Sequence, residues 1–313
     1  MGRLLIVAIV ALVVSGAAQA QRSFDVDILA ETFGFDESTR KSVALDKFMQ
    51  GCPARDCIPS IDNPKYLAAS AADHVADDDL VITLAYKGEY FAFPTSVLDH
   101  HEIVNGTFAG VPLSITWCPL CGSAVGIERT VGDTVTTFGV SGVLYNSDLV
   151  LYDRATETLW DQIEAKGIVG PMTDGQLVLV PVSVSRWSRW YAKHPDTLVL
   201  STNTGFDKDY SQDRFAEYRE STRLFMPVNA EDDRVHAKTV VYGFSTDAGD
   251  VAIAESVLAK DAIYSGEITG KNAVVNLHED GSVTMQRDGE TLHPIRLFWF
   301  AWYTFHPETD LVL

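Results

Sequence analysis

Two cysteines in the middle of the chain have the spacing of a metal-binding turn. They lie in the run Cys118-Pro119-Leu120-Cys121-Gly122, between two segments that we expect to form strands. In such a turn both sulfur atoms point to one side, and a glycine after the second cysteine permits the positive φ angle that closes the turn. The turn supplies two thiolate ligands, so a closed tetrahedral site needs two more from elsewhere in the chain.

His101 is the candidate third ligand, because it precedes the turn by one expected strand. Two thiolates and one imidazole suit copper, as Cu(I), or zinc, since soft sulfur donors select both ions. Glu102 or Asp148 would then orient the imidazole from behind. We therefore predict a copper or zinc site formed by Cys118, Cys121 and His101. An open fourth coordination position would make this a site for catalysis or for passing on the metal, rather than a structural site.

Two other interpretations of the same cysteine pair stay open. Cys118 and Cys121 could form a plain disulfide, or they could act as a thiol–disulfide oxidoreductase without metal. A redox Cys-x-x-Cys pair of the thioredoxin kind begins a helix, which lowers the pKa of the first thiol. Residues 123–129 have the pattern of a strand instead, and this favours the metal site.

Arg129, Asp148, Tyr152 and Arg154 join the two cysteines as candidate catalytic residues. Arg129 would lower the pKa of the thiols, while Tyr152 and Arg154 would line a pocket beside the metal. The alternative for Arg154 is a structural pair with Asp153 in a turn. As an enzyme, the chain would be a metal- or dithiol-dependent oxidoreductase, with a redox partner or a small molecule as substrate.

The second cysteine pair, Cys52 and Cys57, is expected to form a local disulfide. Its Cys-x4-Cys spacing is at the loose end for metal binding, so a four-cysteine zinc site that also uses Cys118 and Cys121 is the weaker alternative. If both pairs were disulfides, the protein would be structural or would serve a partner through another face.

Residues 1–20 have the pattern of a secretory signal peptide. Arg3 supplies a positive charge, residues 4–14 form an apolar run, and small residues up to Ala20 form a cleavage site. The apolar run is too short to span a bilayer, so we expect no stable membrane insertion after cleavage. This leader predicts a periplasmic or extracellular protein, in a compartment where disulfides form.

The composition is that of a globular protein that does not bind nucleic acid. The 313 residues are 46% hydrophobic and 21% charged, which is ordinary for a chain that buries a core. The formal net charge is -19 and the basic residues form no cluster, so the sequence argues against nucleic acid as a partner.

The elements that must position these residues are mainly short strands, which predicts a mainly β (α+β) fold with a few short helices. A tight turn at Lys87-Gly88 joins the first two expected strands. Helical spacing is limited to residues 41–49 and 187–193. The expected strands are residues 81–86, 89–93, 111–117, 123–130, 134–140, 148–152, 158–162 and 177–184.

A degenerate internal duplication of a β-rich unit is predicted from two pairs of similar segments. Residues 187–200 resemble residues 299–313, and residues 81–98 resemble residues 240–258. The cysteine turn occurs only in the first copy, so the function is expected there. The predicted parts are the signal peptide at 1–20, an N-terminal segment at 21–80, the first β-rich copy at 81–205, a linker at 206–239 and a shorter, degenerate second copy at 240–313.

Separate motifs occur along the chain in one order. They are residues 101–105 (HEIVN), 118–122 (CPLCG), 138–142 (FGVSG), 146–154 (NSDLVLYDR), Trp160 with Gln162, 194–200 (HPDTLVL) and 299–307. Together they resemble the prokaryotic domain of unknown function family 3179, and this resemblance implies membership but no activity. His101, Cys118 and Cys121 fit the pattern of that family, whereas Cys52 and Cys57 stand where a glycine-rich stretch is expected. A site that the whole family needs should therefore not depend on the second cysteine pair.

Overall fold

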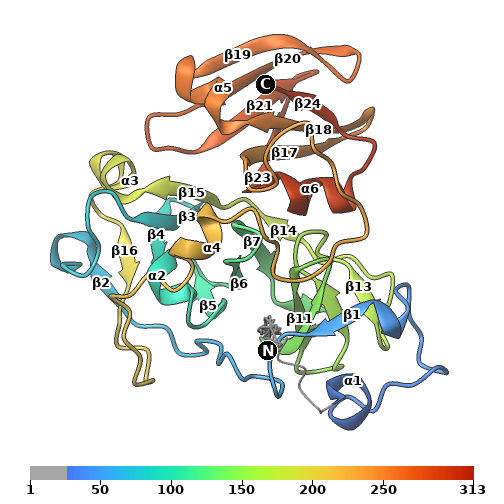
Figure 1. Cartoon of the computed structure of the whole chain (residues 1–313). Helices are drawn as coiled ribbons and strands as arrows, with labels where there is room; N and C mark the ends of the chain where they lie inside the picture. Colours follow the sequence, from blue (N-terminus) through green and yellow to red (C-terminus); the bar gives the residue numbers. More distant parts are fainter. Residues whose placement is uncertain (1–26) are drawn as a thin grey trace, which may run out of the picture.

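The computed structural model describes residues 27–313 of the chain (Figure 1). The predicted signal peptide at residues 1–20 lies outside the described residues. Strands account for 41% of the chain and helices for 14%, which confirms the prediction of a mainly β fold with a few short helices. None of the helices within residues 27–313 is long and apolar enough to cross a membrane.

Five sheets of four or five strands carry the fold, and they are arranged as a ring that resembles a five-bladed β-propeller. Each sheet takes the name of one of its central strands. In strand order, the β10 sheet contains β1 (Phe48–Gln50), β10 (Phe138–Tyr145), β11 (Asp148–Asp153), β12 (Leu159–Asp161) and β13 (Gly167–Val169), and the β6 sheet contains β14 (Leu179–Val180), β7 (Ser123–Glu128), β6 (Val111–Cys118) and β5 (Ile103–Phe108). The β3 sheet contains β15 (Ser183–Arg186), β3 (Leu80–Tyr86), β4 (Glu89–Pro94), β16 (Leu198–Leu200) and β2 (Tyr66–Ala68). The β17 sheet contains β23 (Ile295–Phe298), β17 (Val240–Thr246), β18 (Gly249–Ala254) and β24 (Asp310–Val312), and the β20 sheet contains β19 (Ile263–Ile268), β20 (Lys271–Leu277), β21 (Val283–Arg287) and β22 (Glu290–Leu292).

The remaining elements are short. The strands β8 (Thr130–Val131) and β9 (Thr134–Val135) form a separate pair. The helices are α1 (Ile28–Glu31), α2 (Thr95–Leu98), α3 (Trp187–Lys193), α4 (Ala216–Glu220), α5 (Glu255–Lys260) and α6 (Trp299–Phe305), with 3-10 turns η1 (Leu45–Lys47) and η2 (Ala69–Ala71).

Local turn signals in the sequence are reproduced where the chain forms hairpins. β3 and β4 pair antiparallel up to Tyr86 and Glu89, and the two residues between them, Lys87 and Gly88, have φ angles of +49° and +84°. Two successive positive φ angles match the twist of a two-residue hairpin. The predicted turn at this position is therefore confirmed.

One of the two predicted helices is wrong. Residues 41–49 have helical spacing, but only η1 lies there, and β1 follows it. β1 pairs with β10 through Phe48 and Tyr145, residues far apart in the sequence, and this pairing overrides the local pattern. The other predicted helix, at residues 187–193, is confirmed as α3.

The β3 and β17 sheets share one order of strand pairing. In each, two antiparallel pairings are followed by a parallel one: β15–β3–β4–β16 and β23–β17–β18–β24. α3 and α6 also correspond, because the indole of Trp190 donates to Thr197 and that of Trp302 donates to Thr309, both at 2.9 Å. A duplication would produce this likeness, but the duplication and the predicted domain boundaries stay predictions.

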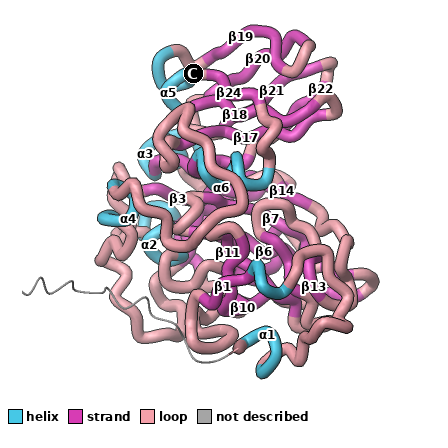
Figure 2. Tube along the Cα trace, turned by 45° about the vertical axis from the view of Figure 1, so that its right-hand side comes forward, coloured by secondary structure: helices cyan, strands magenta, loops and turns pink. Residues whose placement is uncertain are grey.

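The largest cluster of buried apolar side chains joins three parts of the fold. It contains Val125 of the β6 sheet, Leu149 and Trp160 of the β10 sheet, and Trp299 and Trp302 of α6. Figure 2 shows α6 between the strands of the β17 sheet above it and those of the β6 and β10 sheets below it. The cysteines of the predicted site belong to this cluster, so the site lies at a junction of sheets rather than on one sheet.

Candidate metal centre

The cysteine turn joins two long strands of the β6 sheet. β6 ends at Cys118 and β7 begins at Ser123, and these two residues pair across the ladder. Gly122 has a φ of +63°, and a Cβ atom there would lie 3.1 Å from the ring of Phe298. The backbone N–H of Phe298 donates to the carbonyl oxygen of Cys121 at 2.8 Å, so β23 contacts the turn directly. The positive φ and this close approach both favour glycine at position 122.

Asp148 lies beside the two thiols and completes a group of three. The Sγ atoms of Cys118 and Cys121 and a carboxylate oxygen of Asp148 all lie within 4.8 Å of one another. The exposed fractions of the three residues are 1%, 0% and 0%. Asp148 begins β11 directly after Asn146 and Ser147, whose φ angles of +53° and +62° turn the chain out of β10. Two turns from two sheets therefore meet at this buried point.

The carboxylate of Asp148 is only half satisfied by the protein. Its Oδ2 atom accepts a hydrogen bond from the backbone N–H of Ile163 at 3.2 Å. Its Oδ1 atom is buried and has no hydrogen-bond partner among residues 27–313. Because buried polar atoms are almost always paired, an unpaired carboxylate oxygen beside two thiols has the chemistry of a metal ligand.

Burial determines the protonation of this group. Burial, followed by the charge of Cys118, raises the pKa of Asp148 well above its usual value. Burial also raises the pKa of the Cys121 thiol, and its neighbours Cys118 and Asp148 raise it further. Without a cation, Asp148 and the Cys121 thiol therefore retain their protons, and a bound cation would favour their ionised forms.

Two further buried carboxyl groups surround the site. The pKa of Glu102 is raised to about 8, first by burial and then by repulsion from Asp99 and Asp148. Burial and then repulsion from Asp148 raise the pKa of Asp161 well above its usual value, and its Oδ2 atom is also unpaired within the described chain. The sequence reasoning missed Asp161 as a site residue, because only the pairing of β12 with β11, opposite Val150, brings it there.

His101, the predicted third ligand, is not part of this group. Its Nδ1 atom lies 2.7 Å from the carbonyl oxygen of Pro59, and its Nε2 atom lies 2.6 Å from the hydroxyl of Tyr210. Both ring nitrogens therefore have partners other than the thiols. Asp148, which we expected to orient this imidazole, lies beside the thiols in its place.

A bend in the backbone explains the position of His101. β5 pairs with β6 through Ile103 and Thr116, and two more pairs in this register would place His101 opposite Cys118. Glu102 has a φ of +57°, however, so the chain turns away before β5 begins. A positive φ at a glutamate cannot be predicted from the sequence. In the structure Asp148, rather than the expected His101, lies with Cys118 and Cys121.

The three other candidate catalytic residues have structural partners. The guanidinium of Arg129 donates to the carbonyl oxygens of Gly106, Leu113 and Thr136. These bonds join β5 and β6 to the segment before β10. Within residues 27–313, the hydrogen-bond partners of Arg129 do not include the thiols of Cys118 and Cys121.

Tyr152 and Arg154 belong to a separate cluster at the end of β11. The hydroxyl of Tyr152 donates to Asp56 at 2.5 Å, and Arg154 pairs with Asp56 at 3.3 Å and with Asp62 at 3.2 Å. Arg154 therefore binds the N-terminal segment rather than its neighbour Asp153. This arrangement indicates a structural role, because none of these hydrogen bonds reaches the metal group of Cys118, Cys121 and Asp148.

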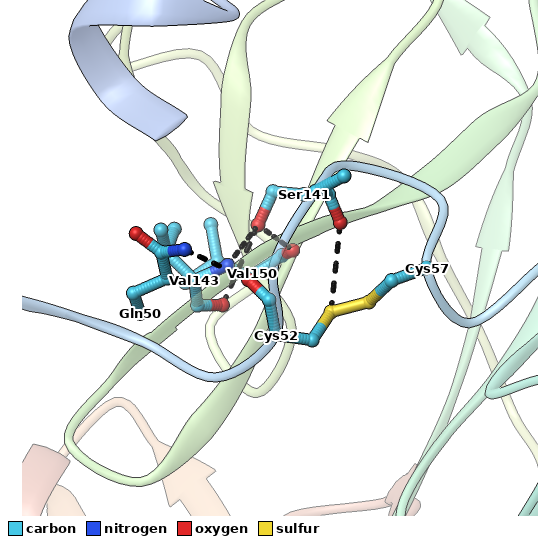
Figure 3. The surroundings of a disulfide bond; sticks show 7 residues. Gln50, Cys52, Cys57, Ser141, Val143 and Val150 are labelled. Carbon is cyan, nitrogen blue, oxygen red and sulfur yellow. Dashed lines mark hydrogen bonds between the residues drawn. A yellow bond between two sulfur atoms is a disulfide. The ribbon is translucent and has the colours of Figure 1, made fainter. Parts of the chain in front are cut away.

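The disulfide between Cys52 and Cys57 is present, as predicted (Figure 3). Its loop is held to β10, because the N–H groups of Gly51 and Cys52 donate to the carbonyl oxygen of Gly142 at 2.8 and 3.2 Å. Cys118 and Cys121 are free thiols. The four-cysteine zinc site is therefore wrong, since one of its pairs is already bonded, and a second disulfide is not formed.

A long connection covers the site. Residues 201–239, termed the covering loop, run from β16 to β17 and contain α4. The hydroxyl of Ser147 donates to the carbonyl oxygen of Met226 at 2.7 Å, and the hydroxyl of Tyr218 donates to that of Leu120 at 3.2 Å. Buried Lys238 donates to several carbonyl oxygens of the loop, Ser221 at 2.7 Å among them. The covering loop is thus bonded both to the β10–β11 turn and to the cysteine turn, the two turns that carry the metal group.

One family model matches most of the chain. It is described as "Protein of unknown function (DUF3179)" and matches residues 55–293. The matched range includes all three members of the metal group and Cys57, but not Cys52. No curated protein and no solved structure matches the chain.

Proposed function

Because the chain belongs to the DUF3179 family, whose description states no function, we propose a function from the site itself: the protein holds one zinc ion between Cys118, Cys121 and Asp148. The observation that carries this proposal is the unpaired, buried Oδ1 atom of Asp148 beside two free thiols. A divalent cation would satisfy that oxygen and both sulfur atoms at once.

The donor set favours zinc over copper. Zinc accepts thiolate, imidazole and carboxylate ligands, and usually four of them. Cu(I) selects soft sulfur donors, and a carboxylate oxygen is a hard one. With Asp148 in place of the expected His101, the third donor is an oxygen, so copper becomes the second candidate.

The same geometry argues against a metal-free redox dithiol. Reactive cysteines are partly exposed and have a lowered pKa, often at the start of a helix. Here both thiols are buried, the pKa of Cys121 is raised, and a strand, β7, follows the turn. Zinc has no redox chemistry of its own. The proposed role is therefore to hold the ion under the covering loop rather than to exchange disulfides.

We also propose that the protein is secreted to the periplasm or beyond. The signal-peptide pattern of residues 1–20 supports this, and so does the Cys52–Cys57 disulfide, because such bonds persist in oxidising compartments. Fractionation of cells and N-terminal sequencing of the product test this point. A chain that keeps residues 1–20 and stays in the cytoplasm would contradict it.

Cobalt substitution tests the ligand set directly. Co²⁺ replaces Zn²⁺ in such sites, and thiolate ligands give it strong charge-transfer absorption in the near ultraviolet. We expect this absorption in the wild-type chain, its reduction in Cys118→Ser, and its retention in the double variant Cys52→Ser/Cys57→Ser. Cobalt binding without thiolate absorption would contradict the proposal.

A further inference from the structure

A pocket outside the metal group borders the cysteine turn. Its volume is about 560 Å³, and Pro119 and Gly122 of the turn form part of its wall. The other walls come from residues 73–80, from α2 and Asp99, from residues 210–219 of the covering loop, and from the ends of β17 and β23. Figures 1 and 2 show α2 and α4 side by side at this place. Segments far apart in the sequence therefore converge on one cavity.

We propose that this pocket binds an organic cation with a primary ammonium group, and that Asp99 is its anchor. Asp99 is 5% exposed and lines the pocket. Its Oδ1 atom accepts a hydrogen bond from the indole of Trp117 at 2.8 Å. No side chain or backbone group of residues 27–313 donates to its Oδ2 atom, which leaves this oxygen for a ligand.

The charges around the pocket favour a cation. Five aspartates line it, against two arginines. Both arginines are paired, Arg219 with Asp213 and Arg296 with Glu255 at 3.1 Å, and Asp78 pairs with Arg186 at 3.4 Å. Three of the five aspartates, Asp73, Asp79 and Asp99, form no ion pair within residues 27–313. The charges of Arg219 and Arg214 act on Asp99, but neither arginine forms an ion pair with it, so an anionic ligand would meet unpaired negative charge there. The aspartates are Asp73, Asp78, Asp79, Asp99 and Asp213.

The apolar part of the wall favours an organic cation over a metal ion. Trp117, Phe298, Leu80 and Pro119 line the pocket, and aromatic faces attract ammonium groups. The only metal-like cluster of three ligands in the described chain is the Cys118 group. The pocket thus combines one buried carboxylate with aromatic and aliphatic walls, which is the chemistry that recognises an alkylamine.

Calorimetric titration at pH 8 with 1,4-diaminobutane tests the proposal on the full mature chain. Burial raises the pKa of Asp99 only to about 6, so its carboxylate is ionised at pH 8. We expect saturable binding of the diamine and none of succinate, its dianionic counterpart. The variant Asp99→Asn keeps an acceptor for the Trp117 indole but loses the charge, so it should weaken binding at least tenfold.

Two matched variants make the result specific. Asp133→Asn changes an exposed aspartate in the turn between β8 and β9 and should leave the affinity unchanged. Cys118→Ser, which removes a metal ligand, should also retain diamine binding, because the pocket does not depend on the proposed zinc ion. Equal affinity in wild type and Asp99→Asn, no binding in the wild type, or equal binding of succinate would overturn the proposal.

Discussion

At the residue scale, the two oxygens of Asp148 have opposite surroundings. One accepts the N–H of Ile163, while the other is buried beside two thiols with no donor in the described chain. Without a metal the carboxyl of Asp148 is protonated and neutral, as its raised pKa indicates. Metal binding must then release protons from Asp148 and from the Cys121 thiol, whose pKa is also raised, so zinc affinity should fall as the pH falls.

The variant Asp148→Asn separates the metal role from the structural one. The amide oxygen of asparagine can still accept from Ile163, so the fold should persist. Zinc affinity should fall at least tenfold, because one anionic ligand is lost. Competition with a chromogenic chelator measures this. The matched control is His101→Gln, which lies outside the group and should bind zinc like the wild type; equal affinities in all three proteins would count against Asp148 as a ligand.

Single residues also show how far the sequence predicts the site. Cys118, Cys121 and Asp148 were all identified, because the turn has a local signature and Asp148 follows a recognisable Asn-Ser turn. The two cysteines were expected to act together, with Asp148 behind His101. That Asp148 itself lies beside the thiols was not predicted, because the positive φ at Glu102 turns His101 away from them. A backbone angle of this kind depends on packing and leaves no periodic signal in the sequence.

At the element scale, hairpins were predictable and distant pairings were not. The β3–β4 hairpin follows from the local signal at Lys87-Gly88. β1, by contrast, forms only because β10 lies beside it, and its residues were expected to be helical. The encounter of the β6–β7 turn with the β10–β11 turn is of the same long-range kind, and the metal group depends on it.

The turn itself can be tested with Gly122→Ala. This change places a Cβ atom in the left-handed region of φ and against the ring of Phe298. We expect the free energy of unfolding to fall by about 1–3 kcal/mol, with weaker zinc binding. Urea unfolding and chelator competition measure the two effects.

Gly88→Ala is the matched control for this turn. Gly88 also has a positive φ, of +84°, but a Cβ atom there meets nothing within 4 Å. It should lower the stability less than Gly122→Ala and should leave zinc binding unchanged. If both variants bound zinc like the wild type, the close packing of the turn would be irrelevant to the site.

At the scale of the whole molecule, the metal group lies where the β6 sheet, the β10 sheet and α6 share one core. The disulfide lies apart from it, in the loop that is fastened to β10. The double variant Cys52→Ser/Cys57→Ser should therefore lower the free energy of unfolding by about 2 kcal/mol, because the short loop is no longer cross-linked in the unfolded chain. The metal group should not be affected. Thermal unfolding and metal analysis check this, and a loss of zinc together with the disulfide would show that the two sites are coupled.

The buried acids make the stability of the metal-free protein depend on pH. The pKa of Glu102 is raised from 4.5 to about 8 on folding. A group with a raised folded-state pKa contributes stability that is fully present below pH 4.5 and is lost as the pH rises through about 8. The variant Glu102→Gln should therefore lose less stability between pH 5 and pH 8 than the wild type, by on the order of a few kcal/mol.

Urea unfolding in the presence of a chelator measures this difference at the two pH values. Glu290→Gln, at an exposed position of β22, is the control and should follow the wild type. If the free energy of unfolding changed with pH equally in Glu102→Gln and the wild type, the pKa of Glu102 would not be raised on folding. This result would contradict the expected pH dependence.

The most direct test of the zinc site is metal analysis combined with a free-thiol count on the mature protein, beside Cys118→Ser and His101→Gln. The structure predicts about one zinc ion per chain in the wild type and in His101→Gln, and almost none in Cys118→Ser. Removal of the metal should expose two titratable thiols on unfolding, those of Cys118 and Cys121. A wild-type chain that holds neither zinc nor copper after anaerobic loading, or equal zinc in Cys118→Ser, would contradict the proposed function.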